Sequence, residues 1–210
     1  MNKIIGLLIL FSCIYTFGFA QNDPNAKKIL DGISTKLKTY KGITASFSYS
    51  TKDRNNKPHG SVNGIINIKD SKYYIKQGTT EIFCNGLKLY NFDGDNEVTI
   101  ADVDNSDDKT LTPQKFLSNF YDKDFTYKLI SSSGNYHQIL MFPTDKRKNF
   151  KQVTVFIDKI KNLITKAKVI DKTDNTIEFA MTNINTAAAI PDTRFVFDVA
   201  KHPGVEVINQ

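Results

Sequence analysis

The sequence predicts a mainly β domain of the α+β class, in which a long, curved antiparallel sheet is covered on one face by amphipathic helices. Three observations support this fold class. About a dozen short segments alternate apolar and polar residues with the period of two that is typical of half-buried strands. Turn-forming residues separate these segments, and two further segments have the period of an amphipathic helix. An apolar helix stripe needs a partner surface, which here can only be the sheet.

Residues 1–20 have the features of a cleaved signal peptide. Lys3 precedes seventeen uncharged residues, and Gly18 and Ala20 put small side chains where a signal peptidase reads them. An uncleaved anchor is the alternative, although the segment is short for a membrane span. A lipoprotein processing site at residues 10–13 is a third interpretation, which the apolar residues after Cys13 disfavour. We therefore expect residues 21–210 to form a single domain.

The first predicted helix begins after Asp23, a good N-cap residue, with Pro24 in its first turn. Its apolar residues fall on one face, and Gly42 is expected to end it. A second, shorter helix is predicted from Thr112 and Pro113 onward, with an apolar side that includes Phe120.

The remaining segments are predicted strands joined by tight turns, so consecutive strands should pair antiparallel. The turns are expected at residues 85–86, 93–96, 131–135, 159–162 and 174–175. The predicted strands cover residues 44–50, 61–69, 71–77, 80–85, 87–92, 97–102, 125–130, 136–142, 151–158, 163–171, 176–183 and 194–198.

Composition limits the possible function classes. Of the 210 residues, 40% are hydrophobic and 11% are aromatic, which excludes a disordered chain, and two cysteines exclude a disulfide-stapled miniprotein. Removal of residues 1–20 leaves Cys84 as a single cysteine in an apolar run, so we expect a buried, inert thiol. The net charge of +6 falls to +5 without Lys3. Scattered lysines favour a solvated surface over contact with an anionic membrane.

No motif points to catalysis, metal binding or nucleic acid. His59, His137 and His202 lie in separate segments without a helical i, i+4 partner. Nucleophile-elbow, P-loop and dinucleotide-binding signatures do not occur in a strand-to-helix setting. The acidic stretches that begin at Asp93 and Asp102 fit a hairpin turn and a solvated loop better than calcium sites. We expect a protein without catalytic activity, metal or cofactor, and without a nucleic-acid partner.

Several segments, in order, resemble the family of LolA-type periplasmic lipoprotein carriers. Residues 23–50 are similar to the family's opening helix and first strand, and residues 64–76, 83–102 and 112–120 continue the likeness. The closing segment is the most specific part, with an F-x-F pattern at 195–197 followed by P-G-V-x-V-I at 203–208. The resemblance spans residues 23–208.

The resemblance implies an unclosed β-barrel with a helical lid over a hydrophobic cavity. Such a carrier would sit in the periplasm of a Gram-negative bacterium and take acylated lipoproteins from an inner-membrane ABC transporter to an outer-membrane acceptor. We expect it to act as a monomer. A lipid- or lipoprotein-sensing module of the same fold, without transport, is the alternative. Periodicity alone leaves open whether the space between helices and sheet is a cavity or filled core.

The cavity would be lined by the apolar faces of the helices and of the sheet. A register shift of one residue would exchange the sheet positions for their neighbours. The predicted lining residues are Ile29, Leu30, Ile33, Leu37, Phe116, Leu117 and Phe120 from the helices, and Phe47, Tyr49, Ile66, Ile68, Tyr73, Ile75, Ile82 and Leu89 from the sheet.

The sequence departs from the family at one position of interest. Many relatives carry an Arg-Pro pair before the third strand, and that arginine is thought to hold the lid shut. The matching residues here are Asp70 and Ser71, preceded by Lys69. Either Lys69 or Asp70 could serve as the lid latch, or residues 70–71 could form an ordinary hairpin turn.

Overall fold

The computed structural model describes residues 22–103 and 120–210. In this part of the chain, helices α1 (Pro24–Leu37) and α3 (Phe120–Asp124) and the short 3-10 helices η1 (Asp192–Phe195) and η2 (Val199–Lys201) accompany twelve strands. The strands are β1 (Ile43–Lys52), β2 (Pro58–Lys69), β3 (Lys72–Gln77), β4 (Thr80–Cys84), β5 (Lys88–Phe92), β6 (Glu97–Asp102), β7 (Phe125–Ser131), β8 (Tyr136–Pro143), β9 (Phe150–Asp158), β10 (Leu163–Asp171), β11 (Thr176–Asn185) and β12 (Glu206–Asn209).

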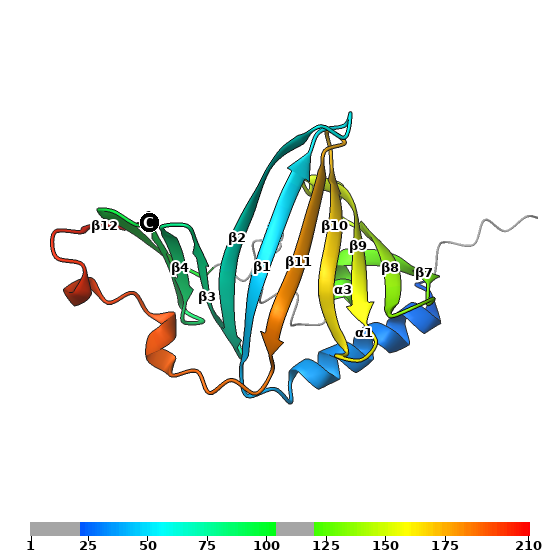
Figure 1. The fold of residues 1–210 in the computed structure, drawn as a ribbon, viewed down its shortest axis with the longest axis horizontal. Coiled ribbons are helices and arrows are strands. Elements are labelled where there is room, and N and C mark those ends of the chain that lie inside the picture. The colour runs from blue at the N-terminus through cyan, green and yellow to red at the C-terminus, as the bar shows by residue number, and fades with distance from the viewer. Residues whose placement is uncertain (1–21, 104–119) are drawn as a thin grey trace, which may run out of the picture.

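All twelve strands belong to one curved sheet, which confirms the predicted fold class (Figure 1). Their order is β12-β6-β5-β4-β3-β2-β1-β11-β10-β9-β8-β7, so β12 and β7 are the two edges and the barrel is unclosed. Neighbouring strands pair antiparallel except β12, which pairs parallel with β6. The first eleven predicted strands correspond to β1 through β11.

The twelfth predicted strand, at residues 194–198, is wrong. Part of it is η1, and the rest runs extended across the sheet without joining it. Phe195 and Phe197 are buried while Val196 between them is 40% exposed. The alternation in this segment therefore reflects packing against a sheet face, and the true last strand is β12.

Helix α1 begins as predicted but ends early. The Asp23 carboxylate accepts hydrogen bonds from the amides of Asn25 and Ala26, and Pro24 is the first helical residue. The helix ends at Leu37 rather than near Gly42. The chain makes a tight turn there, because the amide and the hydroxyl of Thr39 both donate to the Lys36 carbonyl. Gly42 has another role: a Cβ there would lie 2.6 Å from the Ala188 carbonyl oxygen, so it permits a close backbone approach.

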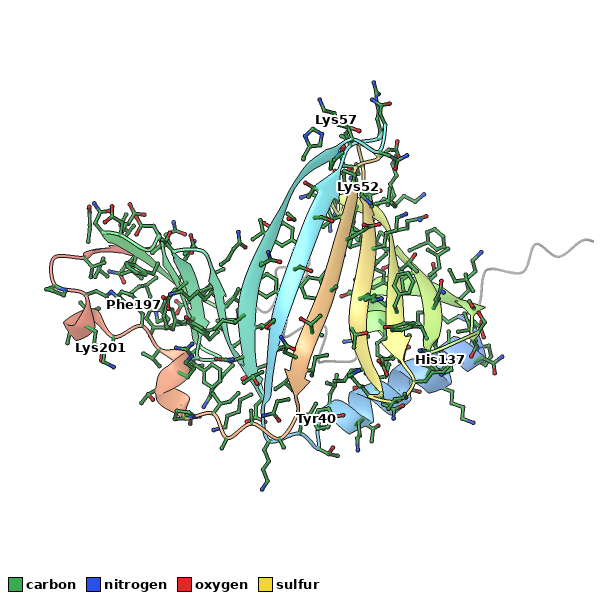
Figure 2. All side chains as sticks on the ribbon, viewed as in Figure 1. Tyr40, Lys52, Lys57, His137, Phe197 and Lys201 are labelled. Carbon is green, nitrogen blue, oxygen red and sulfur yellow. The ribbon has the colours of Figure 1, made fainter. Side chains whose placement is uncertain are left out.

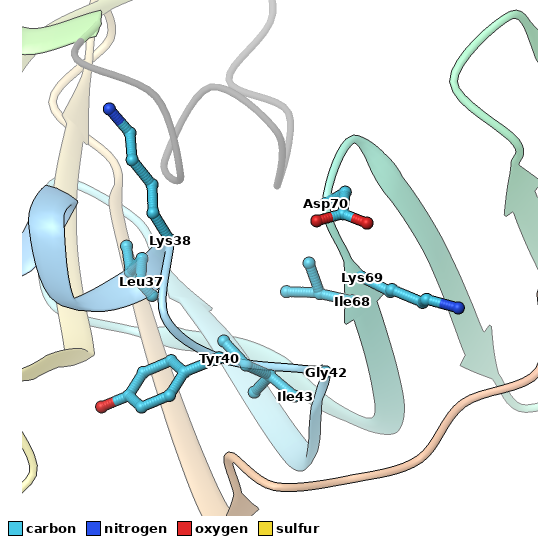
Figure 3. Close-up of a pocket in the computed structure, with 8 residues that line it drawn as sticks. All are labelled: Leu37, Lys38, Tyr40, Gly42, Ile43, Ile68, Lys69 and Asp70. Carbon is cyan, nitrogen blue, oxygen red and sulfur yellow. The ribbon is translucent and has the colours of Figure 1, made fainter.

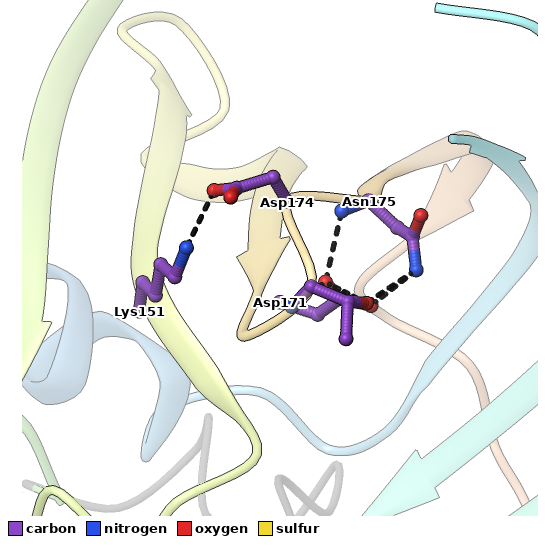
Figure 4. A network of polar contacts seen from close by, with 5 residues as sticks. Lys151, Asp171, Asp174 and Asn175 are labelled. Atoms are coloured by element: carbon purple, nitrogen blue, oxygen red, sulfur yellow. Dashed lines mark hydrogen bonds and ion pairs between the residues drawn. The ribbon is translucent and has the colours of Figure 1, made fainter. Parts of the chain in front are cut away.

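The predicted turns between strands are present in the structure, and carboxylates fix several of them. In the β10–β11 turn, Asp171 accepts from the amides of Thr173 and Asn175, and the Asp174 carboxylate pairs with Lys151 at 2.6 Å (Figure 4). In the β5–β6 turn, Asp93 accepts three backbone amides. The acidic stretch at Asp93 is thus a hairpin turn, as expected.

The two faces of the sheet carry separate cores. We call the concave face of the curved sheet the inner face; α1 packs on part of it (Figure 1). This face holds two apolar clusters, and one of them lies beneath α1. The outer face of β3 to β6 is covered by the C-terminal segment, which we define as residues 186–205. The outer-face cluster consists of Tyr74, Phe83, Phe92 and Val98 from the strands and Ile190, Phe195 and Phe197 from the C-terminal segment.

Candidate functional site

The eight sheet residues predicted to line a cavity all lie on the inner face, in one cluster. Strand alternation puts them on the same side, and the register aligns them across neighbouring strands. Ile66, Ile75 and Ile82 form one cross-strand row. We call this set the groove cluster; its buried members are Ile43, Ala45, Phe47, Ile66, Ile68, Tyr73 and Cys84, and its partly buried members are Leu37, Tyr40, Tyr49, Ile75, Ile82, Leu89, Val103, Phe179, Met181 and Ile184.

The groove cluster is apolar and only partly covered. Tyr49, Ile75, Ile82 and Leu89 are half-buried, so the cluster keeps partly exposed hydrophobic side chains. Desolvation of such side chains by a ligand would be favourable by about 25 cal/mol for each Å² of apolar area. This surface is suited to an aliphatic ligand.

Strand β11 supplies groove residues that the sequence did not reveal. Phe179 and Met181 oppose Tyr49 and Phe47 of β1, and the rings of Phe47 and Phe179 stack with centroids 5.9 Å apart. The alternation of residues 176–183 indicated a strand with these side chains on one face. The pairing of that strand with β1, far away in the chain, had no local signal.

Gly64 makes room for the aromatic wall of the groove. A Cβ at this position would lie 2.5 Å from Cζ of Phe47 and 2.3 Å from the Lys76 carbonyl oxygen. Glycine thus lets the Phe47 ring lie flat against β2, and this packing positions Phe47 between β2 and Phe179.

The predicted helix residues divide between two clusters. Leu30 and Ile33 are buried, and Ile29 partly buried, against β7 to β9, in a cluster that includes Phe125 and Val155. Leu37 packs against both this cluster and the groove cluster. The helix therefore contributes core over most of its length and reaches the groove at its C-terminal end. The predicted lining residues Phe116 and Leu117, and the side chain of Phe120, lie outside the described residues.

A pocket opens where the end of α1 meets the groove. It has a volume of about 160 Å³ and lies among Leu37, Lys38, Tyr40, Gly42, Ile43, Ile68, Lys69 and Asp70 (Figure 3). Its apolar floor continues the groove cluster through Leu37, Ile43 and Ile68. Lys38 and Asp70 stand on opposite sides of it. We refer to it as the mouth pocket.

The two latch candidates have different surroundings. Lys69 donates to the Ile190 carbonyl at 3.1 Å and pairs with Asp192 at 2.8 Å, so it holds the C-terminal segment on the outer face. These contacts do not test a latch role for Lys69, which stays a prediction. Asp70 has φ +53° in the two-residue β2–β3 hairpin, so residues 70–71 form a turn. A latch role for Asp70 at the mouth pocket stays a prediction.

Polar contacts instead hold α1 at its N-terminal half. Lys27 pairs with Asp122 at 2.7 Å and with Asp31 at 3.2 Å. The hydroxyl of Tyr121 donates to Asp31 and that of Tyr127 donates to Asp122, each at 2.7 Å. These contacts tie α1 to α3 and β7, and we call them the helix anchor. The Lys27–Asp31 pair has the i, i+4 spacing of neighbours on a helix, whereas nothing in the sequence indicated the contacts with Tyr121, Asp122 and Tyr127.

The environment of the helix anchor shifts the pKa of several members. Hydrogen bonds from Lys27 and from the Tyr127 hydroxyl lower the pKa of Asp122. Burial, followed by the bond to Asp122, raises the pKa of Tyr127 to about 12. The bond to Asp122 also raises the pKa of Lys27. In the groove, burial raises the pKa of Tyr73 and of Cys84, whose thiol is fully buried as predicted.

The described part of the chain holds neither a metal-ligand cluster nor a membrane-spanning helix. Among residues 22–103 and 120–210, no group of three or more His, Cys, Asp or Glu side chains could hold a metal ion. In the same residues no helix has the length and apolar character needed to cross a membrane.

Comparison with known proteins identifies the family. Among solved structures, an uncharacterized conserved protein from Thermus thermophilus has a TM-score of 0.60 at 8% identity, covering 89% of this chain and 99% of that one. The structure of the MucA/MucB complex of Pseudomonas aeruginosa has a TM-score of 0.50 at 13% identity, and the match covers 83% of this chain and 62% of that one. A LolA superfamily protein from Nitrosomonas europaea has a TM-score of 0.44 at 10% identity, and the match covers 83% of this chain and 98% of that one.

At such low identities the first two structures show a shared fold and no more. Comparison with curated protein sequences finds none that matches. The model of the family described as outer membrane lipoprotein carrier protein LolA, however, matches residues 38–198, which is most of the chain. The chain belongs to the LolA family.

Proposed function

We propose that this protein is a periplasmic carrier that binds the acyl chains of lipoproteins in the groove and moves them from the inner to the outer membrane. The observation that carries the proposal is the half-buried, apolar groove cluster on the inner face. Membership of the family supports the same ligand class. In this proposal residues 1–20 are a signal peptide, residues 21–210 form one domain, and the chain has no catalytic step.

The chemistry of the cargo explains why a carrier is needed. Each methylene exposed to water costs about 0.8 kcal/mol, so two or three acyl chains cost tens of kcal/mol. A lipoprotein cannot cross an aqueous compartment unless a protein covers those chains. The groove offers aliphatic and aromatic side chains from β1 to β5 and β11 for this purpose.

The acyl-binding step is tested by a matched pair of charge substitutions. Ile82→Glu puts a carboxylate on the half-buried groove surface, and Ile65→Glu puts one on the opposite face of the sheet, where Ile65 is 40% exposed. We expect protein purified with Ile65→Glu to retain co-eluting acylated peptide or lipid by mass spectrometry. Protein with Ile82→Glu should lose it while secretion continues. Equal cargo in both variants would contradict the groove assignment.

The transport step is tested in the host. Depletion of the protein should cause lipoproteins to accumulate in the inner-membrane fraction, because release by an ABC transporter then has no recipient. Re-expression of the wild-type chain should restore sorting, whereas the Ile82→Glu chain should not. Unchanged sorting after depletion would refute the carrier role, with its proposed transporter and outer-membrane acceptor.

A sensing module of the same fold is the second candidate. It is favoured by the likeness to MucB, which has been solved in complex with MucA. That chain is longer, since this protein covers 62% of it. A sensor should bind acylated ligand in the mass-spectrometric assay yet leave lipoprotein sorting unaffected in the depletion experiment, so the two experiments together separate the candidates.

A further inference from the structure

One end of the sheet combines basic and exposed apolar side chains around the mouth pocket. The end of α1, the β2–β3 turn, the β4–β5 turn and the β9–β10 turn all lie at this end, because the strands between them alternate in direction. Tyr40 marks this end in Figure 2, and Lys57 in the β1–β2 turn marks the opposite end. We call the first the mouth rim.

The two most exposed large hydrophobic side chains of the described residues lie on turns of the mouth rim. Ile160 is 85% exposed in the β9–β10 turn, and Leu87 is 77% exposed in the β4–β5 turn. The Asp158 carboxylate accepts the amides of Ile160 and Lys161, which fixes the turn and presents the Ile160 side chain outward. An exposed isoleucine at a fixed turn lowers solubility, and the Ile160 side chain contributes little to the core of this chain.

Both turns connect to the mouth pocket. The Tyr40 hydroxyl donates to the Lys161 carbonyl at 3.4 Å, which joins the β9–β10 turn to the segment after α1. On the other side, a Cβ at Gly86 would lie 2.8 Å from Oγ of Ser71, so the β4–β5 turn lies against the β2–β3 turn next to Asp70. Two turns, each with one exposed apolar side chain, therefore flank the mouth pocket.

Among the described residues, the unpaired charge at the mouth rim is mostly positive. Lys36, Lys38 and Lys41 are exposed, and within the described chain none of the three has a carboxylate partner. Most acids at this end are already paired with lysines: Asp158 with Lys161, Asp102 with Lys88, and Asp192 with Lys69 and Lys72. Asp70 is the exception. Lys36, Lys38 and Lys41 are close together in the sequence, and the end of α1 places them at the mouth rim.

We infer that the mouth rim docks on the surface of an anionic lipid bilayer. Lys36, Lys38 and Lys41 would contact lipid phosphates, while Ile160 and Leu87 would insert between the headgroups. Basic side chains at the same end as protruding apolar ones have this combined preference for an anionic interface. Docking in this orientation turns the mouth pocket toward the bilayer. The inference goes beyond the carrier function and does not depend on bound cargo.

The test uses vesicles that contain no lipoprotein. Protein recovered from its host, with its N-terminus established by mass spectrometry, is sedimented with vesicles of phosphatidylglycerol and phosphatidylcholine in equal parts or of phosphatidylcholine alone. We expect binding to the mixed vesicles only, and weaker binding as salt rises. Equal binding to both vesicle types, or none to the anionic ones at low salt, would overturn the inference.

Matched variants locate the contact. Lys38→Glu with Lys41→Glu should weaken binding by at least about 25-fold, since each lysine at an anionic surface contributes about fivefold. Arg54→Glu with Lys57→Glu, at the opposite end, should retain near wild-type binding. All variants share one N-terminus, so any contribution from it cancels. Equal loss in both pairs would overturn the assignment to the mouth rim.

A second pair tests the apolar contact. Ile160→Ser should weaken binding by about tenfold through loss of apolar burial, whereas Val199→Ser, at a side chain 46% exposed on the C-terminal segment, should not. If the mouth-rim variants bind vesicles normally but fail to collect lipoprotein from transporter-containing membranes, the rim contacts a protein and the bilayer inference is refuted. Normal docking together with unchanged lipoprotein sorting after depletion would instead refute the carrier function alone.

Discussion

Gly64 is a single residue on which the shape of the groove depends. A methyl group there must displace the Phe47 ring or the β3 backbone, so Gly64→Ala should destabilise the fold by about 1–3 kcal/mol. It should also weaken acyl binding, because Phe47 moves into the groove. Urea denaturation and the mass-spectrometric cargo assay measure the two effects. A stable variant with undisturbed cargo would show that Phe47 has space elsewhere.

Gly32 provides the control for the Gly64 substitution. It lies in the middle of α1, where an added Cβ would meet nothing within 4 Å and where φ is not positive. Gly32→Ala should therefore stabilise the protein by about 0.5–1 kcal/mol, the difference in helix propensity. The same chemical change thus has opposite signs at two positions, and the packing at each position decides which.

Asp122 makes the helix anchor sensitive to acid. Its pKa is lowered in the folded protein by Lys27 and Tyr127, so the unfolded chain binds a proton more readily. The anchor therefore stabilises the fold above about pH 4 and loses this contribution as the pH falls through the folded pKa. We expect an effect of no more than about 1 kcal/mol, because the Asp122 side chain is 39% exposed.

Two variants test this pH dependence by urea denaturation. Asp122→Asn should be less stable than wild type at neutral pH, and the difference should shrink below about pH 4. Lys27→Met should reduce the same difference, because it removes the main cause of the lowered pKa. A constant difference across the pH range would mean that Asp122 acts through packing rather than charge.

At the scale of elements, the N-terminus of α1 also protects an edge of the sheet. The carboxylate of Asp23 accepts the Leu129 amide at 2.9 Å, and the side-chain carbonyl of Asn22 accepts the Tyr127 amide at 3.0 Å. Both amides belong to the edge strand β7. The helix start thus satisfies edge groups that could otherwise pair with another chain.

Hydrogen exchange tests this double role of Asp23. Asp23→Ala should speed exchange of the Leu129 amide and of the first-turn amides of α1, because both lose the same acceptor. Asp23→Asn should preserve protection of the first-turn amides, since asparagine caps helices about as well, but not of the Leu129 amide, because the asparagine side chain has one acceptor oxygen where the carboxylate has two. Amides in β9, inside the sheet, should not change. Uniform acceleration throughout the chain would point to global destabilisation instead.

The sequence could predict most elements because each strand shows one buried face. Eleven segments with period-two alternation became strands in the expected order, and Asp23 began the helix as expected. The segment at 194–198 has the same alternation but lies on the sheet rather than in it. Alternation records which side chains are buried, and it carries no information on which backbone groups pair.

The candidate site was predictable to the extent that strand parity fixes it. The eight sheet residues share a face, because residues of one parity within a strand lie on one side and each short hairpin turn fixes which parity lies on that side in the next strand. Phe179 and Met181 could not be assigned to the same site, since β11 reaches β1 through a long-range pairing. The contact of the helix anchor with α3 was equally invisible, because it joins Lys27 to Asp122 across 95 residues.

At the scale of the whole molecule, the two faces of one sheet have separate tasks. The outer face of β3 to β6 is sealed by Phe195 and Phe197, whose side chains are 0% and 4% exposed, and Lys69 and Lys72 fasten the same segment through Asp192. The groove cluster on the inner face keeps partly exposed apolar side chains. If the proposed function holds, packing on the outer face of β3 to β6 leaves the inner face of the same strands free to bind a ligand and release it.

This separation predicts opposite outcomes for two substitutions. Phe195→Ala should lower the free energy of unfolding by about 3–5 kcal/mol, because it leaves a cavity at a fully buried site between the C-terminal segment and the sheet. The fraction that remains folded should still carry acyl cargo, since the groove is untouched. Ile82→Glu should lower cargo strongly and stability less, because its side chain is half-buried. Denaturation midpoints and cargo per folded molecule measure both. If Phe195→Ala also emptied the folded molecules of cargo, the two faces would be coupled through β3 and β4, and the C-terminal segment would have to be counted as part of the binding machinery.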